Sequence, residues 1–246
     1  MKKITLLLIS GLFVFTSCQE DEPQAVVQLS AEESAEIVSS SVATDIVGIT
    51  TDLSAFSSQV SVDGGRLEAT NSISCGQLKD TTITSNYTGQ YITFDFSSAY
   101  SLELICTEQG LPNELTASFL IQGDYDGQRL TAEGDTEGNL SLTGFGLSNV
   151  AYTLSGSVDR DYLIVQKEGE QNGYNSLSEI QLQSVLIDKE TGLIAGGVAL
   201  YNVSGSRVNG DTFSFTATVT FNGDRTATIV TENREFIVNL ATGQLL

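Results

Sequence analysis

The spacing of apolar residues changes near residue 60, from a helical period to a period of two. Before this point, eight apolar residues follow one another in steps of three or four and form one stripe: Ala31, Ala35, Val38, Val42, Ile46, Ile49, Leu53 and Phe56. Ser30 and Glu33 have the spacing of a capping box at the start of this segment. We therefore predict an amphipathic helix over residues 30–58, kinked or split near Gly48, because glycine weakens a helix by about 1 kcal/mol relative to alanine.

Beyond residue 60, apolar and polar residues alternate, as in Phe213–Phe221, which places Phe, Ala and Val on one face and Thr and Ser on the other. This alternation is typical of antiparallel strands with one buried face and one wet face. Asn222-Gly223 and similar pairs separate the strands, since these residues tolerate the positive φ of tight hairpin turns. We predict about a dozen strands in one mainly β domain over residues 59–246.

The expected architecture is an antiparallel meander that forms a strongly curved sheet or a barrel-like layer, with the 30–58 helix packed against its apolar face. The pattern leaves open whether the sheet closes into a barrel, stays half open around the helix, or folds into a two-layer sandwich.

The first residues have the layout of a secretory signal. Two lysines precede the apolar segment Ile4–Phe15, which is too short to serve as a permanent membrane span. The small residues before Cys18 resemble the lipobox that lipoprotein signal peptidase reads, although Phe15 stands where leucine is usual. We expect residues 1–17 to be a lipoprotein signal peptide and Cys18 to be lipidated, which would hold the chain on a membrane. The alternative is an ordinary signal peptide followed by a chance cysteine.

An acidic run, Glu20-Asp21-Glu22, follows Cys18, and residues 18–29 are expected to be a tether. The run resembles the surface-export signal of Bacteroidetes lipoproteins. It would also suit a simple solvated spacer, because like charges keep a tether extended. We expect a lipid-anchored outer-membrane protein at the cell surface, with the periplasmic leaflet as the alternative.

Composition narrows the function. The chain has 31 acidic and 11 basic residues, so its net charge of −20 argues against nucleic acids and anionic lipid surfaces as direct partners. It contains no histidine, which removes the usual general base near neutral pH and the commonest metal ligand. An enzyme is therefore not the favoured interpretation, although the carboxylate chemistry of glycosidases remains open.

Cys75 and Cys106 are the cysteines left once Cys18 carries lipid. In an oxidising compartment two such cysteines most simply pair, so we predict a disulfide between them, with two buried thiols as the alternative.

Four acidic residues lie near turns expected at Asp126-Gly127 and Glu137-Gly138: Asp124, Asp126, Asp135 and Glu137. Carboxylates at alternating positions can hold Ca²⁺, so these residues are a weak candidate cation site. The segment lacks the complete ligand set of an EF-hand loop, and Asp and Gly are also what hairpin turns require. Asp159 and Asp161, on either side of Arg160, are interpreted as part of an exposed loop. No other cofactor is expected.

Tyr87, Tyr91 and Tyr100 are candidate binding residues, because aromatic side chains on a strand surface can stack on a glycan or a peptide. Aromatic residues in strands also often belong to the core.

Several segments give the chain a resemblance to a family. It is similar to uncharacterised Bacteroidetes (flavobacterial) outer-membrane lipoproteins through Leu29–Glu33, Cys75-Gly76 with Asp80–Thr82, Tyr100–Leu102 leading to Cys106, Phe213–Gly223 and Phe236–Gly243. The resemblance implies a lipid-anchored, β-rich envelope protein of unassigned function, and it brings no catalytic residues.

Three functions remain as hypotheses. The leading one is a non-enzymatic binding or structural role, with the membrane as partner through Cys18 and a glycan or another envelope protein as a further partner. The second is a carboxylate-based hydrolase of extracellular glycans. The third is a carrier that holds an apolar ligand in the curved sheet, with the helix as a gate.

Overall fold

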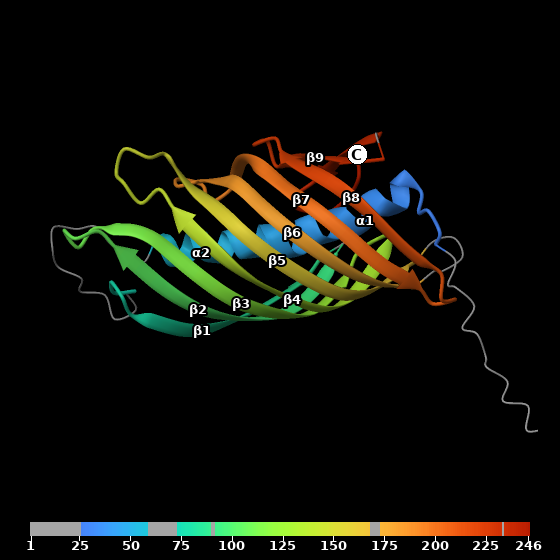
Figure 1. The fold of residues 1–246 in the computed structure, drawn as a ribbon, viewed down its shortest axis with the longest axis horizontal. Coiled ribbons are helices and arrows are strands. Elements are labelled where there is room, and N and C mark those ends of the chain that lie inside the picture. Colours follow the sequence, from blue (N-terminus) through green and yellow to red (C-terminus); the bar gives the residue numbers. More distant parts are fainter. Residues whose placement is uncertain (1–25, 59–72, 90–91, 168–172, 233) are drawn as a thin grey trace, which may run out of the picture.

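A computed structural model describes residues 26–58, 73–89, 92–167, 173–232 and 234–246. The strands within these ranges form one antiparallel sheet whose spatial order is the order of the sequence. They are β1 (Leu78–Thr88), β2 (Thr93–Cys106), β3 (Pro112–Asp126), β4 (Leu130–Thr143), β5 (Ala151–Gln166), β6 (Gly173–Asp188), β7 (Ile194–Arg207), β8 (Thr212–Phe221), β9 (Thr226–Thr231) and β10 (Arg234–Asn239). Figure 1 shows the sheet curving around the helix, which runs along its concave side.

The predicted meander with a packed helix is confirmed, and the sheet is not closed into a barrel. The described strands number ten rather than about a dozen, because two expected breaks, the turn at Gly138 and the loop at 159–161, lie inside the strands β4 and β5. Gly138 lies in the middle of β4, opposite Phe119 of β3. A Cβ atom on Gly138 would lie 2.4 Å from the Ser157 carbonyl oxygen and 2.9 Å from the Phe119 ring, so glycine makes room for that ring.

The helix has three parts: α1 (Ala31–Ser41), a π-helical turn η1 (Val42–Ile46) and α2 (Val47–Ser58). The predicted capping box is present, since the Glu33 amide donates to Ser30 Oγ (3.2 Å) and the Ser30 amide donates to the Glu33 carboxylate (2.8 Å). The irregular turn ends two residues before Gly48, close to the predicted break. A π turn adds a residue to one helical turn, and such insertions are frequent at functional sites.

The whole predicted apolar stripe is buried, as expected. The helix is more deeply enclosed than an amphipathic helix lying on a flat sheet, because the curved sheet also covers serines outside the stripe: Ser34, Ser39, Ser40 and Ser41. Serine is small enough for these positions, and in a helix its hydroxyl can donate to a backbone carbonyl one turn back, as at Ser39 and Ser40. Ser39 Oγ donates to the Glu36 carbonyl (2.9 Å), and Ser40 Oγ donates to the Ile37 carbonyl (2.8 Å).

The described end of the expected tether is part of the domain. Val26 forms a parallel bridge with Thr212 of β8, and Leu29 is 3% exposed within the core. Leu29 therefore belongs to the core, whereas Val26 and Gln28 of the same expected tether are exposed. Residues 1–25, including Cys18 and the proposed signal peptide, lie outside the described residues.

Cys75 and Cys106 form the predicted disulfide, which joins the segment before β1 to the end of β2.

Within the described ranges, none of the helices combines the length and the apolar character needed to cross a membrane.

Candidate functional site

A cavity of about 270 Å³ opens where the sheet does not close. The side of the helix around η1 and the start of α2 forms its floor, strands β1 to β3 form one wall, and the segment after β10 forms the other. Most of the lining surface is apolar, although threonine, serine and aspartate side chains also line the cavity. The apolar residues include Ala43, Val47, Ile92, Phe94, Phe96, Ile121 and Leu240. We call this space the seam cavity.

The segment after β10 is held in place by a tight return. The Gly243 amide donates to the Asn239 carbonyl (2.8 Å), and Gly243 adopts a φ of +67°, which glycine tolerates without strain. The Leu246 amide then donates to the Ile237 carbonyl (2.8 Å), so the last residues run back along β10. This return sets residues 240–242 over the helix, where they face the wall formed by β2 and β3.

Aromatic rings dominate the opposite wall. The rings of Phe94 and Phe96 are stacked with centroids 5.6 Å apart, and Tyr87 stacks on Phe94 at the same separation. Phe94 and Phe96 point to the concave side because they alternate with residues that face solvent along β2. Stacked rings of this kind give a binding site a rigid apolar surface.

The seam cavity also has a polar end, at Asp52 of α2. The Tyr100 hydroxyl of β2 donates a hydrogen bond to Asp52 Oδ2 (2.9 Å). Desolvation raises the pKa of the Asp52 carboxyl above its ordinary value, and the hydrogen bond from Tyr100 opposes part of that rise. Burial beside Asp52 also raises the pKa of Tyr100, so this hydroxyl stays protonated and remains a donor.

A second carboxylate, Asp45, lies in the π turn and belongs to a buried ion pair. Arg160 Nε of β5 lies 2.7 Å from Asp45 Oδ2, and the two side chains are 0% and 1% exposed. The Arg160 guanidinium also sits 3.7 Å above the centre of the Tyr162 ring. Desolvation raises the pKa of Asp45, while the charge of Arg160 opposes the rise. Asp45 is thus committed to Arg160, and Asp52 is the more accessible carboxylate of the cavity.

The predicted aromatic site is only partly brought together. Tyr100 is a core residue that packs edge-on against Phe56 of α2, with ring centroids 5.3 Å apart. Tyr87 is 50% exposed at the mouth of the concave side, next to Phe94. Tyr91 lies outside the described residues. The aromatic residues that line the cavity are Phe94, Phe96 and Tyr125. Phe94 and Phe96 belong to the same aromatic segment of the sequence as the three predicted tyrosines, although the tyrosines were the expected binding residues.

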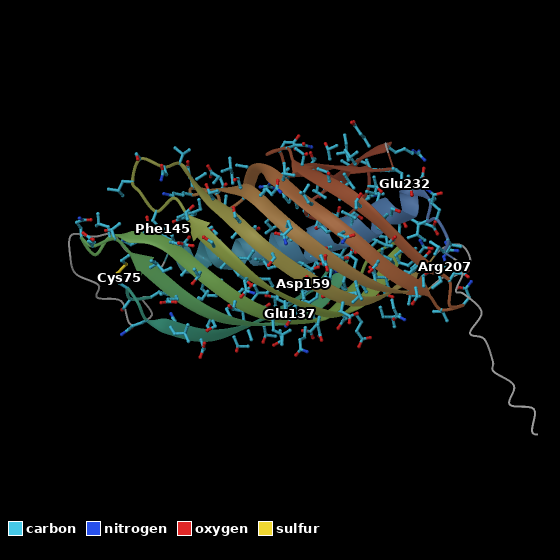
Figure 2. All side chains as sticks on the ribbon, viewed as in Figure 1. Cys75, Glu137, Phe145, Asp159, Arg207 and Glu232 are labelled. Atoms are coloured by element: carbon cyan, nitrogen blue, oxygen red, sulfur yellow. A yellow bond between two sulfur atoms is a disulfide. The ribbon has the colours of Figure 1, made fainter. Side chains whose placement is uncertain are left out.

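The candidate cation residues Asp124, Asp126, Asp135 and Glu137 are all exposed on β3 and β4, on the convex face of the sheet. Figure 2 shows Glu137 on this face beside Asp159 of β5, its cross-strand neighbour. Asp126 is paired with Lys167, and Asp135 accepts a hydrogen bond from Gln122 (3.0 Å). Within the described parts of the chain, no three Asp, Glu or Cys side chains form a group that could hold a metal ion.

Sequence reasoning missed Asp45, Asp52 and Arg160. The segment 159–161 is not the expected loop but the middle of β5, where Asp159 and Asp161 face solvent and Arg160 faces the helix. One signal could have found Arg160: it occupies an inward position in the alternation of Val158, Arg160 and Tyr162. Because Asp159 and Asp161 flank it, Arg160 was interpreted as one of three charged residues in an exposed loop.

Comparisons with known proteins add no identification. The chain matches no model of a protein family, and searches of curated proteins and of solved structures found nothing similar to it.

Proposed function

We propose that this protein is a lipid-anchored envelope protein that binds a small, mainly apolar molecule in the seam cavity, without catalysing a reaction. The observation that carries the proposal is the cavity itself, with about 270 Å³ of space and a mostly apolar lining. An engineered apolar cavity of about 150 Å³ is enough to bind benzene, so the seam cavity has room for a bicyclic aromatic group or a short acyl chain. Apolar walls with few polar groups are the usual composition of a small-molecule site.

The position of the cavity revises the carrier hypothesis. Val38, Val42, Ile46 and Ile49 are all fully buried against the sheet, so the helix itself fills the concave face. The space for a ligand lies on the other side of the helix, at the open seam. The helix is then one wall of the site, and the residues that close over it are 240–242.

A hydrolase is less well supported by the same geometry. Glycoside hydrolysis by the usual mechanism needs two carboxyl groups that face each other across the substrate. The seam cavity is lined by Asp45 and Asp52, but Asp45 is fully buried and holds Arg160. One accessible carboxylate suits recognition of a ligand better than acid–base catalysis.

The binding site can be tested with the neutral fluorescent probe N-phenyl-1-naphthylamine, using the chain with Cys18→Ser so that no lipid is attached. The chain has no tryptophan, which keeps the protein background low. Gly48 lines the cavity, and a Cβ atom there would meet nothing within 4 Å. Gly48→Leu therefore adds its Cβ atom without a clash, and its longer side chain is chosen to fill the cavity from a helical position.

We expect the probe to bind the parent chain and to lose at least tenfold in affinity with Gly48→Leu. Gly48→Ala is the matched control, because it also removes the helix penalty of glycine but adds one methyl group. Both variants should be at least as stable as the parent, so loss of binding cannot be ascribed to unfolding. Equal affinity in the Leu variant and the parent, or no binding to the parent, would refute the proposed site.

The lipid anchor is a separate part of the proposal and rests on Cys18 and the residues before it. Labelled palmitate should be incorporated into the full chain in cells and should be absent from Cys18→Ser. Persistent labelling of the variant, or a wild-type chain recovered wholly in the soluble fraction, would refute the anchor without affecting the cavity.

A further inference from the structure

The polar groups of the seam cavity are not balanced in charge. Its described lining contains two carboxylates, Asp45 and Asp52, and no lysine or arginine. Arg160 neutralises Asp45 from behind the helix, at 2.7 Å. Among the described residues, Asp52 has no cation as partner, and its hydrogen bond comes from the neutral hydroxyl of Tyr100. The cavity therefore carries an uncompensated negative charge at one end of an apolar space.

Only one of the two Asp52 carboxylate oxygens accepts a hydrogen bond from a described residue. Tyr100 donates to Oδ2, and no other hydrogen bond to this carboxylate occurs within the described residues. A carboxylate removed from water and left with one neutral donor is costly, and a charged donor would repay that cost. The second oxygen is thus available to a donor that enters the cavity.

The aromatic wall points to the same kind of ligand. Phe94 and Phe96 offer stacked ring faces, which attract cations as well as apolar groups. The net charge of −20 on the chain raises the local concentration of cations and opposes the approach of anions. A carboxylate ligand such as a fatty acid would meet Asp52 with a like charge.

Building on the proposed function, we infer that the natural ligand of the seam cavity is a small organic amine: a protonated ammonium group that binds Asp52, carried on an apolar body that packs against Phe94 and Phe96. A hydrogen bond between two charged groups contributes more than a neutral one, so the ammonium group should improve affinity by about tenfold or more over a neutral analogue.

Three probes that share one body separate the charge from the apolar contact: 2-naphthylmethylamine, 2-naphthylmethanol and 2-naphthoate. Their affinities can be measured by calorimetry at pH 7 on the Cys18→Ser chain. We expect the amine to bind at least tenfold more tightly than the alcohol, and the naphthoate to bind more weakly than either. Asp52→Asn keeps an oxygen that can accept from Tyr100, and it should reduce the affinity for the amine to that for the alcohol.

Asp159→Asn is the charge-matched control, because it removes one negative charge from the exposed face of β5, away from the cavity. The preference for the amine should survive in this variant. Loss of the preference in both variants would show general attraction by the acidic surface and would overturn the inference.

The outcomes also separate this inference from the proposed function. Equal binding of the amine and the alcohol, with both lost in Gly48→Leu, would overturn the amine and leave the apolar site standing. Failure of all three probes to bind would overturn both. Tight binding of the naphthoate would contradict the assignment of Asp52 as the group that selects the ligand.

Discussion

The ion pair between Asp45 and Arg160 leads to a prediction in which the two partners behave differently. Both side chains are fully buried, between the π turn of the helix and the middle of β5. Replacement of either one leaves a charge in the core without its counter-ion, and such changes typically cost about 3–5 kcal/mol. A carboxylate can escape this cost by taking up a proton, whereas a guanidinium stays charged at every accessible pH.

The free energy needed to protonate Asp45 sets an upper limit on the loss of unfolding free energy caused by Arg160→Met. Protonation of a carboxyl with an ordinary pKa of 3.8 costs about 1.36 kcal/mol for each pH unit above that value. The limit is therefore about 4.4 kcal/mol at pH 7 and about 1.6 kcal/mol at pH 5. Asp45→Leu has no such limit, because a guanidinium cannot neutralise itself by losing a proton, so its cost of about 3–5 kcal/mol should not fall between pH 7 and pH 5.

The direction of the pKa shift of Asp45 determines whether the stability of Arg160→Met rises or falls as the pH is lowered. Without Arg160, the effect of burial on Asp45 is opposed only by the hydrogen bonds from Thr44 and Ser41, so the pKa of Asp45 in the folded chain rises further above that in the unfolded chain. A carboxyl group whose pKa is raised on folding destabilises the fold above that pKa, and stability returns as the pH falls through it. Arg160→Met should thus recover up to about 2.7 kcal/mol relative to wild type between pH 7 and pH 5.

Urea unfolding at pH 7 and pH 5 measures these differences, with each variant compared with wild type at the same pH. For an m value of about 2–3 kcal/mol/M, a loss of 4 kcal/mol lowers the midpoint by about 1.3–2 M. The double variant Asp45→Leu with Arg160→Met should lie closer to wild type than Asp45→Leu alone, because no charge is left unpaired. Costs that are equal for the two single variants and independent of pH would refute the reasoning.

Three further predictions concern stability. Replacement of Cys75 and Cys106 by alanine should lower the free energy of unfolding by at most about 3.7 kcal/mol in urea, because their disulfide closes a loop with a sequence separation of 31. Asp52→Asn should raise the melting temperature at pH 7 and change it little at pH 4, because desolvation raises the pKa of Asp52 and disfavours its charged form; an equal rise at both pH values would contradict this. Gly138→Ala should cost about 1–3 kcal/mol, since a Cβ atom there overlaps a backbone oxygen in the next strand; a neutral effect would indicate that the sheet adjusts freely.

The parts of the fold that depend on local chemistry could be predicted from the sequence. The capping box at Ser30, the apolar stripe from Ala31 to Phe56 and the meander were all accessible because neighbouring residues determine them. The turn expected at Gly138 was wrong because glycine there serves an adjacent strand, and nothing in the local sequence shows which strand will lie alongside.

The seam cavity could not be predicted, for a physical reason. Its walls come from segments near residues 48, 95 and 241, which meet because the sheet curves without closing. Curvature is a property of the whole sheet, set by twist and by irregular positions such as the register shift between Leu154 and Gly156. Asp52 therefore appeared in the sequence as one more polar residue of an amphipathic helix.

The attachment of the start of the helix to the last strands has a consequence for the order of assembly. Glu33 accepts from Tyr174 (3.0 Å) and pairs with Arg207, while Glu32 pairs with Arg234 (2.5 Å). These partners are separated by more than a hundred residues, so the helix leaves the ribosome long before its partners are synthesised. Hairpins can form one by one behind it, because each strand pairs with its sequence neighbour. The contacts of Glu32 and Glu33 can form only after the final strands have been synthesised. A nascent chain stopped before β7 should therefore still be readily digested by proteases.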